Sequence, residues 1–404
     1  MSLSPHITQP DNDTNKLRVL LVHNAYQQRG GEDAVVDAEH ALLREHGHAV
    51  ELFQRHNDEL LTMPRWQAAL NTLWSSESAV LITRTIERFR PEVVHFHNTF
   101  PLISPAAYWA VRAAGLPVIQ TLHNFRLHCP QAIYLRDGKV CEECKGRVPW
   151  RSVVHACYRG SRAQSAVASG MLLLHRARGS YRHAVTRYIA LNDFCRETLL
   201  AGGLPASRVR IKPNFVDFTP PPADALRSGF LYVGRLSEEK GIAVLCAAWA
   251  ASRGQELRVA GAGPDAALIG QRTDIRALGA LSGADVRREM GRATALVLPS
   301  ICYDSFPRTL VEAFACGLPV IASRLGPLTQ LIDDGVTGLL FEAGNADELA
   351  QKLVWASEHP QALAEMGRRA RARYEAEFSA ERNYAQLMAI YREAISAINE
   401  DADA

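Results

Sequence analysis

Short apolar runs alternate with longer amphipathic stretches along most of the chain. The first run, Leu17 to His23, is followed by a helical pattern from about Glu32 to Glu45. Further apolar runs lie at 49–53, 91–98, 116–124, 187–192 and 207–214. A strand buried on both faces of a sheet lacks polar alternation, so these runs predict parallel strands joined by helices. The first half of the chain is therefore expected to be an α/β domain.

A proline-rich stretch at 212–229 interrupts this alternation. Four prolines lie between Pro213 and Pro222 without an apolar period, a composition typical of a linker. The pattern then resumes, with strands predicted at 229–236, 256–264, 273–280, 294–300, 318–323 and 337–343. Helices are expected at 239–250, 283–291 and 307–315, and two more lie between about Pro360 and Ile398.

These patterns divide the chain into five parts. We expect a flexible tail at 1–16, an α/β domain at 17–215, a linker at 216–228, a second α/β domain at 229–380 and a terminal helix at 381–404. The first domain contains a cysteine-rich insert at 126–160.

The composition narrows the class of protein. The chain has 404 residues, of which 47% are hydrophobic and 22% charged, which is ordinary for globular proteins and excludes a disordered or collagen-like chain. The net charge of +2 gives no argument for nucleic acid as a partner. No apolar run approaches the roughly 18 residues of a membrane span, and the polar N-terminus lacks a signal-peptide core. We therefore expect a cytoplasmic protein without disulfides.

Polar residues gather where predicted strands of the first domain end, which is where open α/β sheets bind ligands. Two adjacent glycines follow the first strand; they either let a phosphate approach a helix N-terminus or make a plain turn. Imidazole and amide groups end the third and fourth strands and predict a polar pocket floor, although a lone histidine is usually structural. These residues are Gly30, Gly31, His95, His97, Asn98, His123 and Asn124.

The second domain repeats this arrangement with charged groups. Gly234 and Arg235 follow a strand and Lys240 opens a helix, which would suit a diphosphate, or is ordinary surface charge. Gly261 and Gly263 resemble half of a dinucleotide fingerprint, a weak match that a tight turn explains equally well. Asp304 follows a further strand, and Glu312 lies eight residues later on a helix before an apolar run, where a carboxylate needs a partner.

Several of these segments together carry a resemblance. Asp304-x7-Glu312 with EAFACGLPVIAS, GRLSEEKG at 234–241, VAGAGP at 259–264, DGVTGLLF at 334–341 and the Gly30-Gly31 loop resemble motifs of the family 4 glycosyltransferases. The resemblance implies a GT-B fold, in which two Rossmann-like α/β domains face each other across a cleft. It also implies a nucleotide-diphosphate sugar donor of UDP or GDP type, a retaining reaction, no catalytic metal, and a terminal helix that crosses back to the N-terminal domain.

The resemblance assigns roles by position. Arg235 and Lys240 would hold the donor diphosphate, Glu312 the ribose, and Asp304 and His123 the transferred sugar. The loop from Ser305 to Arg308 would assist, and Gly30 and Gly31 would lie near the phosphates and acceptor. The resulting donor-binding set is Gly30, Gly31, Gly234, Arg235, Lys240, Ser305, Phe306, Pro307, Arg308 and Glu312, with His97, Asn98 and Asn124 as acceptor-side candidates. Asp304 departs from the usual glutamate and is one methylene shorter, which leaves its sugar contact open.

Four cysteines cluster in the insert. Cys129, Cys141, Cys144 and Cys157 are separated by 11, 2 and 12 residues, and a C-x2-C with flanking cysteines is a plausible structural zinc site. Free or redox-active thiols and a metal cluster remain alternatives, and His128 and His155 are possible substitute ligands. The other four cysteines are expected to be small apolar fillers.

A basic segment overlaps the insert. Residues 145–192 contain no Asp or Glu and nine cations, together with Trp150, Tyr158 and the apolar run at 171–174. Such a segment attracts anionic lipid headgroups, could hold a lipid-diphosphate acceptor, or is a solvated helix face. We therefore expect possible peripheral contact with an anionic membrane at the inner face of the cell membrane. The nine cations are Lys145, Arg147, Arg151, Arg159, Arg162, Arg176, Arg178, Arg182 and Arg187.

The leading hypothesis is a retaining glycosyltransferase that extends a lipid-linked or polysaccharide-precursor acceptor in cell-surface glycan synthesis. The alternatives are a GT-B sugar-nucleotide epimerase, a transferase with a small acceptor, or a non-catalytic protein that binds sugar nucleotides or acts through zinc. An NAD-dependent dehydrogenase would rest on Gly261 and Gly263 alone.

Overall fold

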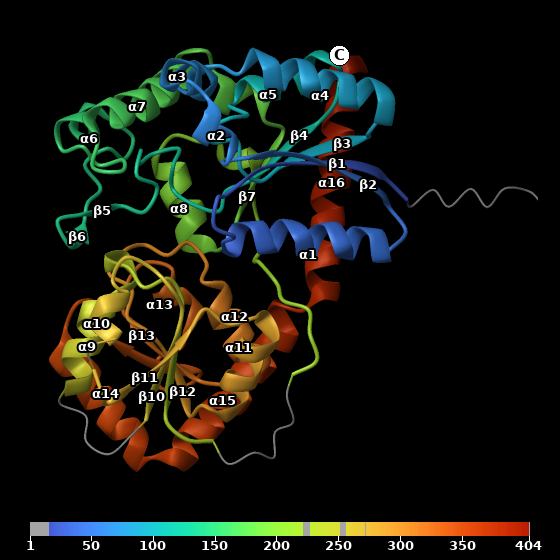
Figure 1. Cartoon of the computed structure of the whole chain (residues 1–404). Helices are drawn as coiled ribbons and strands as arrows, with labels where there is room; N and C mark the ends of the chain where they lie inside the picture. The colour runs from blue at the N-terminus through green and yellow to red at the C-terminus, as the bar shows by residue number, and fades with distance from the viewer. Residues whose placement is uncertain (1–15, 221–226, 251–255, 271, 404) are drawn as a thin grey trace, which may run out of the picture.

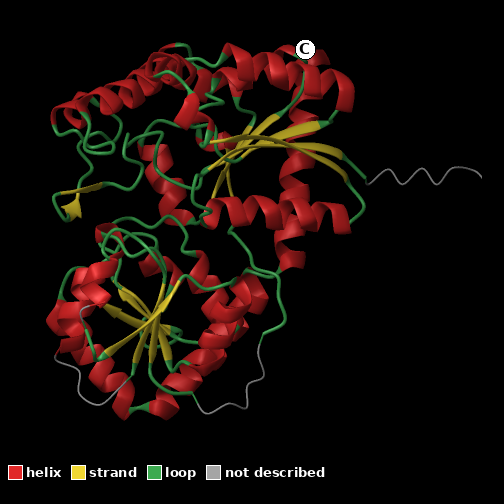
Figure 2. Cartoon of the chain, in the orientation of Figure 1, coloured by secondary structure: helices red, strands yellow, loops and turns green. Residues whose placement is uncertain are grey.

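Two parallel sheets of six strands each, both flanked by helices, form the two halves of the computed structural model (Figures 1 and 2). The structure describes residues 16–220, 227–250, 256–270 and 272–403. The expected tail, apart from Lys16, lies outside these residues, as does 221–226 of the expected linker. The prediction of two α/β domains with parallel sheets is confirmed.

The N-terminal sheet has the strand order β2-β1-β3-β4-β7-β8. Its central strands are fully buried, which explains why they are short apolar runs without polar alternation. Their neighbours pair in parallel throughout. The strands are β1 (Arg18–Ala25), β2 (Ala49–His56), β3 (Val93–Phe96), β4 (Val118–Thr121), β7 (Arg187–Ala190) and β8 (Val209–Ile211).

Helices cover both faces of this sheet. Several begin at a residue whose side chain caps the first turn; Ser75 accepts from the amide of Ser78, and Asn192 from that of Cys195. The helices are α1 (Gly31–Glu45), α2 (Glu59–Thr62), α3 (Arg65–Leu73), α4 (Ser76–Phe89), α5 (Ala106–Ala113), α6 (Trp150–Val154), α7 (Arg162–Ala177) and α8 (Asp193–Ala201). The insert adds a hairpin of β5 (Leu135–Arg136) and β6 (Lys139–Val140).

The C-terminal sheet has the order β11-β10-β9-β12-β13-β14. Its strands are β9 (Phe230–Val233), β10 (Leu257–Ala260), β11 (Ile275–Gly279), β12 (Ala295–Leu298), β13 (Val320–Ser323) and β14 (Gly338–Phe341). Its helices are α9 (Ile242–Ala250), α10 (Ala266–Gly270), α11 (Gly283–Arg292), α12 (Arg308–Ala315), α13 (Leu328–Leu331), α14 (Ala346–Glu358) and α15 (Pro360–Glu377).

The last helix leaves the C-terminal half. In Figure 1, α16 (Ala380–Asp403) runs along the N-terminal sheet. Its Leu387 and Tyr391 pack with Val19 and Leu21 of β1 in one buried cluster. The C-terminal end of the chain therefore completes a core that begins at its first strand.

Candidate active site

The order of strands reverses direction at one point in each sheet. In the N-terminal sheet the connections run from β1 out to β2, then back across to β3; in the C-terminal sheet they run from β9 out to β11, then back to β12. Beyond the carboxyl ends of such strands an open α/β sheet leaves a crevice between diverging loops. Most of the residues singled out from the sequence lie in the loops after β1, β3 and β4 and in those after β9, β10 and β12.

Cations and carboxylates meet at the C-terminal switch point. The Lys240 ammonium forms an ion pair with the Asp304 carboxylate, from the loop after β12. Burial would lower the pKa of Lys240, but Asp304 raises it above its usual value, so the amine stays charged. The Arg235 side chain is exposed, and within the described ranges it makes no hydrogen bond or ion pair. The site thus holds one paired cation and one cation available to an anionic ligand.

Glu312 lies on α12 with its side chain largely buried. Its Oε1 is 3.2 Å from Nε of Arg308, one turn earlier on the same helix. Burial raises the pKa of Glu312, and the Arg308 guanidinium opposes that rise. A partly desolvated carboxylate with one ionic partner retains lone pairs for hydroxyl donors.

The loop between Asp304 and α12 offers backbone rather than side chains. The Phe306 ring is buried against Phe378 at 5.8 Å between centroids, so only its backbone can reach a ligand. The amides of Ser305, Phe306 and Arg308 have no hydrogen-bond partner in the part of the chain that the structure describes. Pro307, the helix N-cap, has no amide hydrogen to give.

Gly261 and Gly263 are explained by close backbone packing. A Cβ on Gly261, at φ +153°, would lie 1.8 Å from the carbonyl oxygen of Gly234, and one on Gly263 would lie 2.2 Å from that of Leu236. These glycines let the loop after β10 lie against the loop after β9 that carries Arg235. The structure favours the tight turn over the dinucleotide fingerprint.

His123 meets this site from the other domain. The Ser305 hydroxyl donates to the His123 carbonyl oxygen, and the Asn192 side-chain amide donates to the Ser305 carbonyl oxygen at 2.7 Å. Burial lowers the pKa of His123 to about 3, so its ring is neutral at pH 7. The strand-end loops of the two sheets therefore touch at the residues for which sugar contact is expected.

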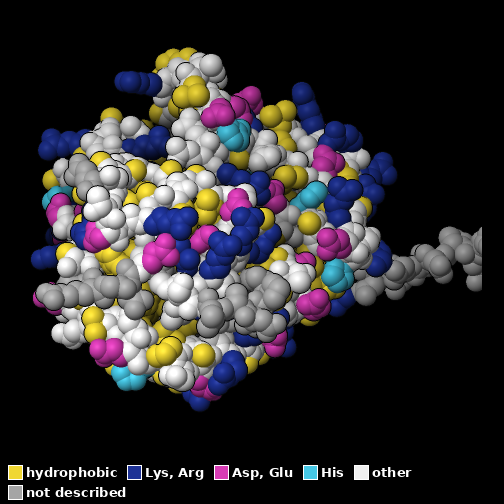
Figure 3. Space-filling view, turned by 60° about the horizontal axis from the view of Figure 1, so that its bottom comes forward, with side chains coloured by type: hydrophobic (Ala, Val, Ile, Leu, Met, Phe, Trp, Pro, Cys, Tyr) yellow, Lys and Arg dark blue, Asp and Glu magenta, His cyan; other side chains and the backbone are white. Residues whose placement is uncertain are grey.

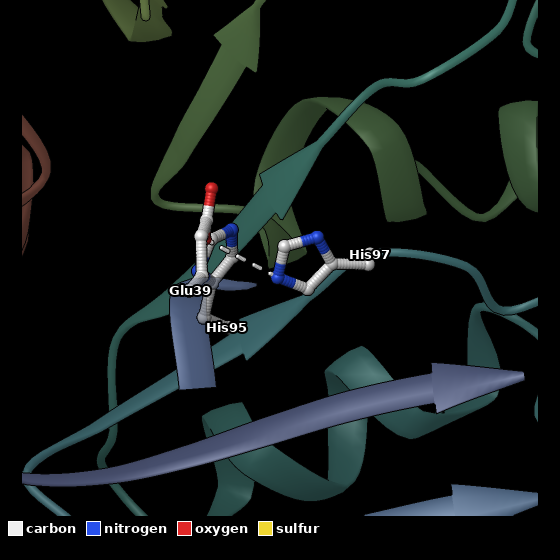
Figure 4. A group of neighbouring side chains, drawn as sticks. All are labelled: Glu39, His95 and His97. Carbon is white, nitrogen blue, oxygen red and sulfur yellow. Dashed lines mark ion pairs between the residues drawn. The ribbon is translucent and has the colours of Figure 1, made fainter. Parts of the chain in front are cut away.

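A network of buried polar side chains connects His123 to Glu39 on α1. His97 Nδ1 lies 2.9 Å from His123 Nε2, and His97 Nε2 lies 3.5 Å from Oε2 of Glu39 on α1 (Figure 4). The ionised Glu39 favours the tautomer in which His97 carries its proton on Nε2. His97 Nδ1 then accepts from His123 Nε2–H, which leaves His123 Nδ1 as an acceptor for a ligand hydroxyl.

The same cluster contains a fully buried ion pair. Lys212 Nζ lies 2.6 Å from Glu39 Oε1, and both side chains are 0% exposed. Burial would raise the pKa of Glu39, but Lys212 and neighbouring groups lower it. Sequence reasoning missed both residues because nothing in an amphipathic helix or a linker motif marks a buried charge.

Glu39, His95 and His97 place their ligand atoms within 4.8 Å of one another, close enough to hold a metal ion (Figure 4). Protein partners already use most of these groups, and only Glu39 Oε2 and His97 Nε2 of the cluster lack a hydrogen-bond partner among the described residues. Glu39 binds the Lys212 ammonium, and His95 bonds the Tyr391 hydroxyl at 2.8 Å and the Thr121 hydroxyl at 2.7 Å. The buried ammonium would repel a cation, so we interpret the cluster as a structural network that orients His97 and His123.

The side-chain amides of two acceptor-side candidates, Asn98 and Asn124, form hydrogen bonds with nearby backbone groups. Asn98 donates to the Asn24 carbonyl oxygen and accepts from the Phe100 amide, and Asn124 accepts from the Arg126 amide. They nevertheless line an open pocket with His97, His123, Gln120 and Arg126, and with apolar walls that include Phe100 and Met171. Polar groups set among apolar walls are typical of small-ligand sites.

The Gly30-Gly31 loop begins α1. The Gly30 amide donates to Asp33 Oδ2 at 2.7 Å, and Asp33 Oδ1 lies 2.8 Å from His23 Nε2. Burial would raise the pKa of Asp33, but these hydrogen bonds lower it. The Gly30 amide is thus already engaged, whereas a Cβ on Gly31 would meet nothing within 4 Å. The space at Gly31 is open to a ligand.

The four clustered cysteines line one cavity, together with Arg136 and Arg151. Burial and the other three cysteines raise the pKa of the Cys157 thiol to about 11. His128 and His155 do not line this cavity. Cys195, Cys302 and Cys316 are buried, as expected of apolar fillers, and Cys246 is partly exposed.

Only some of the cations in the basic segment, residues 145–192, are exposed. Arg176 donates to the carbonyl oxygens of Arg147 and Leu127, and Arg187 pairs with Glu393 of α16. Neither is available to a membrane. The exposed cations are Arg147, Arg151, Arg159, Arg162, Arg178 and Arg182. Among the helices that the structure describes, none is both long and apolar enough to cross a bilayer.

Comparison with known proteins connects both halves to one group of enzymes. Residues 29–219 match the model of Glycosyltransferase Family 4, and residues 227–359 match that of Glycosyl transferases group 1. The D-rhamnosyltransferase WbpZ of Pseudomonas aeruginosa is 33% identical over 160 residues, which are 37% of this chain and 42% of WbpZ. The amylovoran biosynthesis glycosyltransferase AmsK of Erwinia amylovora is 29% identical over 223 residues, 50% of this chain and 55% of AmsK. The chain thus spans about half the length of these relatives or less.

Solved structures share the fold. Sucrose-phosphate synthase from Thermosynechococcus elongatus superposes with a TM-score of 0.71 at 19% identity, over 95% of this chain and 100% of that one. Anabaena HepE in complex with UDP and glucose superposes with a TM-score of 0.66 at 19% identity, over 92% of this chain and 98% of HepE. The predicted GT-B fold is confirmed.

Proposed function

Because the chain belongs to the family 4 glycosyltransferases, we propose that it transfers a sugar from a nucleotide-diphosphate sugar to a hydroxyl of a lipid-linked or polysaccharide-precursor acceptor, with retention. The observation that carries this proposal is the ion pair between Lys240 and Asp304 at the C-terminal switch point, with the next residue, Ser305, hydrogen-bonded to the backbone of His123 in the opposite domain. The names of WbpZ and AmsK support a glycan product, and HepE supports a UDP-type donor.

The groups divide the work of the transfer between them. Arg235, the shared Lys240 and the free amides around Ser305 hold the diphosphate and stabilise the charge that develops as it leaves. Glu312 accepts from the ribose hydroxyls, and His123 Nδ1 accepts from a hydroxyl of the sugar. Asp304 is already paired with Lys240. When the donor binds, Lys240 and Asp304 therefore share their ion pair with the donor, because Asp304 is not a free carboxylate beforehand.

The proposed reaction needs no protein side chain as a base. The bond between the sugar C1 and the diphosphate oxygen breaks, and the acceptor oxygen forms a bond to C1 from the same face. The acceptor proton passes to the leaving diphosphate oxygen. Both bond changes take place where the C-terminal site meets the pocket lined by His97 and His123.

The test is a thermal-shift panel of UDP, GDP and ADP with wild type, Glu312→Ala and Arg235→Ala. A nucleotide at a hundred times its dissociation constant stabilises the protein by about 2.7 kcal/mol. One nucleotide should raise the Tm of wild type, and the shift should disappear in both variants. Arg276→Ala is the matched control, because this exposed arginine on β11 pairs with Glu256 and belongs to neither candidate site. Equal shifts in all variants, or near-wild-type turnover of Arg235→Ala, would contradict the assignment.

Peripheral docking on an anionic membrane is the second part of the proposal. Trp66, Leu70, Trp150 and Val154 are all more than half exposed and lie on α3 and α6, which both pack on α7 (Figure 1). Exposed arginines, including Arg151 and Arg162, lie on α6 and α7. Exposed tryptophans beside cations suit the headgroup region of a bilayer. The face in Figure 3, by contrast, mixes cations and carboxylates.

Vesicle flotation tests this docking. Wild type should float with vesicles that contain phosphatidylglycerol and not with phosphatidylcholine alone. A variant with Arg151, Arg162 and Arg178 changed to Gln should lose most of this binding, because each cation near an anionic surface contributes about 1 kcal/mol. Replacing Arg276, Arg288 and Arg292 of the C-terminal half is the matched control. Unchanged flotation of the first variant would remove the idea.

A further inference from the structure

We propose that Cys129, Cys141, Cys144 and Cys157 bind one zinc ion, and that the insert held by this ion braces the donor-site loop that carries Asp304. The four residues line a single cavity. They arrive there from three separate segments: the turn after β4, the end of the β5–β6 hairpin and the end of α6. Four cysteines on one cavity supply the donor set of a closed zinc site. Metal binding would draw their sulfurs closer together, because among the described residues only Glu39, His95 and His97 already place their ligand atoms within 4.8 Å of one another.

The surroundings of the cavity suit a metal thiolate. A zinc tetrathiolate carries two negative charges. Two arginines, Arg136 and Arg151, line the cavity and also share an ion pair with Glu143.

The insert has little regular secondary structure. Its only sheet is the pair of two-residue strands β5 and β6. Five non-glycine residues adopt positive φ between positions 132 and 159, out of seven in the described part of the chain: Ala132, Tyr134, Asp137, Ala156 and Arg159. Strained backbone persists only where its surroundings determine it strongly. A bound metal supplies such a constraint, because binding free energy becomes folding free energy.

The insert contacts the donor site of the other domain. Tyr303, the residue before Asp304, packs on Tyr134 at 5.7 Å and on Phe125 at 6.2 Å between ring centroids. The Cys129 amide bonds the Phe125 carbonyl oxygen, and the Cys141 amide bonds that of Tyr134.

A continuous path therefore links metal and donor. Cys129 and Cys141 are hydrogen-bonded to the two residues whose rings support Tyr303, and Tyr303 fixes the start of the loop in which Asp304 pairs with Lys240. Loss of the metal would release the insert, and with it the position of Asp304. Tyr303 is thus a positioning residue, and this second half of the inference rests on the proposed donor site.

The zinc content of the protein can be measured without an activity assay. Full-length protein purified without chelator should contain one zinc per chain by elemental analysis, and Cys141→Ser/Cys144→Ser should contain none. Cys246→Ser is the matched control, since this cysteine lies outside the insert, and it should keep the zinc. Folded wild type without zinc, a stoichiometric iron content, or disulfides between these cysteines by mass spectrometry would each overturn the site.

The brace is tested by nucleotide affinity. Tyr303→Ala should keep its zinc yet bind the nucleoside diphosphate about tenfold more weakly, and Tyr303→Phe, which keeps the ring contacts, should recover most of the affinity. Wild type stripped of zinc by a chelator should show the same loss, and Tyr303→Ala should add nothing to it, because the two changes interrupt one path. Unchanged affinity in Tyr303→Ala or in stripped protein would refute the brace. If no nucleotide binds wild type, the proposed donor site fails while the zinc content still stands.

Discussion

Lys212→Met removes one partner of the fully buried pair with Glu39. The change keeps the length of the side chain but leaves the carboxylate without its counterion in a site where both residues are 0% exposed. Breaking a buried pair from one side costs about 3–5 kcal/mol. The pair also connects β8 to α1, and Lys212 reaches Asn383 of α16 at 3.3 Å, so the loss is felt by three elements.

Thermal unfolding measures the effect. For a unit of about 200 residues, 1 kcal/mol corresponds to about 2–4 °C in Tm, so Lys212→Met should lower the Tm by about 6–20 °C. Arg210→Met is the matched control, two residues earlier in the chain. Its partner Glu393 is partly exposed, and such pairs contribute about 0–1 kcal/mol. A Lys212→Met protein as stable as Arg210→Met would refute the reasoning.

The loss of stability caused by Lys212→Met should also depend on pH. In wild type the pKa of Glu39 lies below its usual value, so its stabilisation is present above the unfolded pKa and is lost as pH falls through the folded one. Without Lys212, burial raises the Glu39 pKa instead, and the variant regains stability as the carboxyl is protonated. The difference in Tm between wild type and Lys212→Met should therefore shrink from pH 7.5 to pH 5. A constant or growing difference would show that Glu39 is not the source of the instability.

Three further outcomes are expected. Gly261→Ala should lose about 2 kcal/mol or more in chemical denaturation, because its Cβ would clash with the Gly234 carbonyl oxygen, and Gly31→Ala, which has open space, should not. Tyr391→Phe should cost about 1–3 kcal/mol by the same assay, because it leaves the buried His95 Nδ1 without a partner. His123→Ala should lower kcat in a donor-turnover assay while its Tm stays within a few degrees of wild type, and a parallel loss of both would make the residue structural.

The sequence predicted the sheets more completely than the helices between them. Central strands such as β1 and β12 are short runs buried on both faces, so their composition alone marks them. The segments that become α3, α4 and α7 were not predicted, although Ile82 and Ile86 of α4 lie one turn apart on a buried face. The terminal helix was expected to cross back from a family resemblance, and only the contacts of Tyr391 supply the physical reason.

The residues of the candidate site also differ in how well the sequence could predict them. Arg235, Lys240, Asp304 and Glu312 follow strands or open helices, so their positions could be predicted from local pattern. Asp33, Glu39 and Lys212 could not, because their roles depend on partners far away in the chain: 173 residues separate Glu39 from Lys212. Tyr303 was missed for a similar reason, since its contacts come from an insert that no local periodicity connects to it.

The crossing of α16 has a consequence for synthesis on the ribosome. The N-terminal domain emerges first, yet its buried His95 waits for Tyr391, 296 residues later. Throughout translation of the second domain, the patch of Val19 and Leu21 that α16 will cover stays open to water. Vectorial folding would therefore hold the first domain in an unfinished state until α16 has emerged from the ribosome. A nascent chain stalled just short of position 380 should recruit chaperones that the finished protein no longer needs.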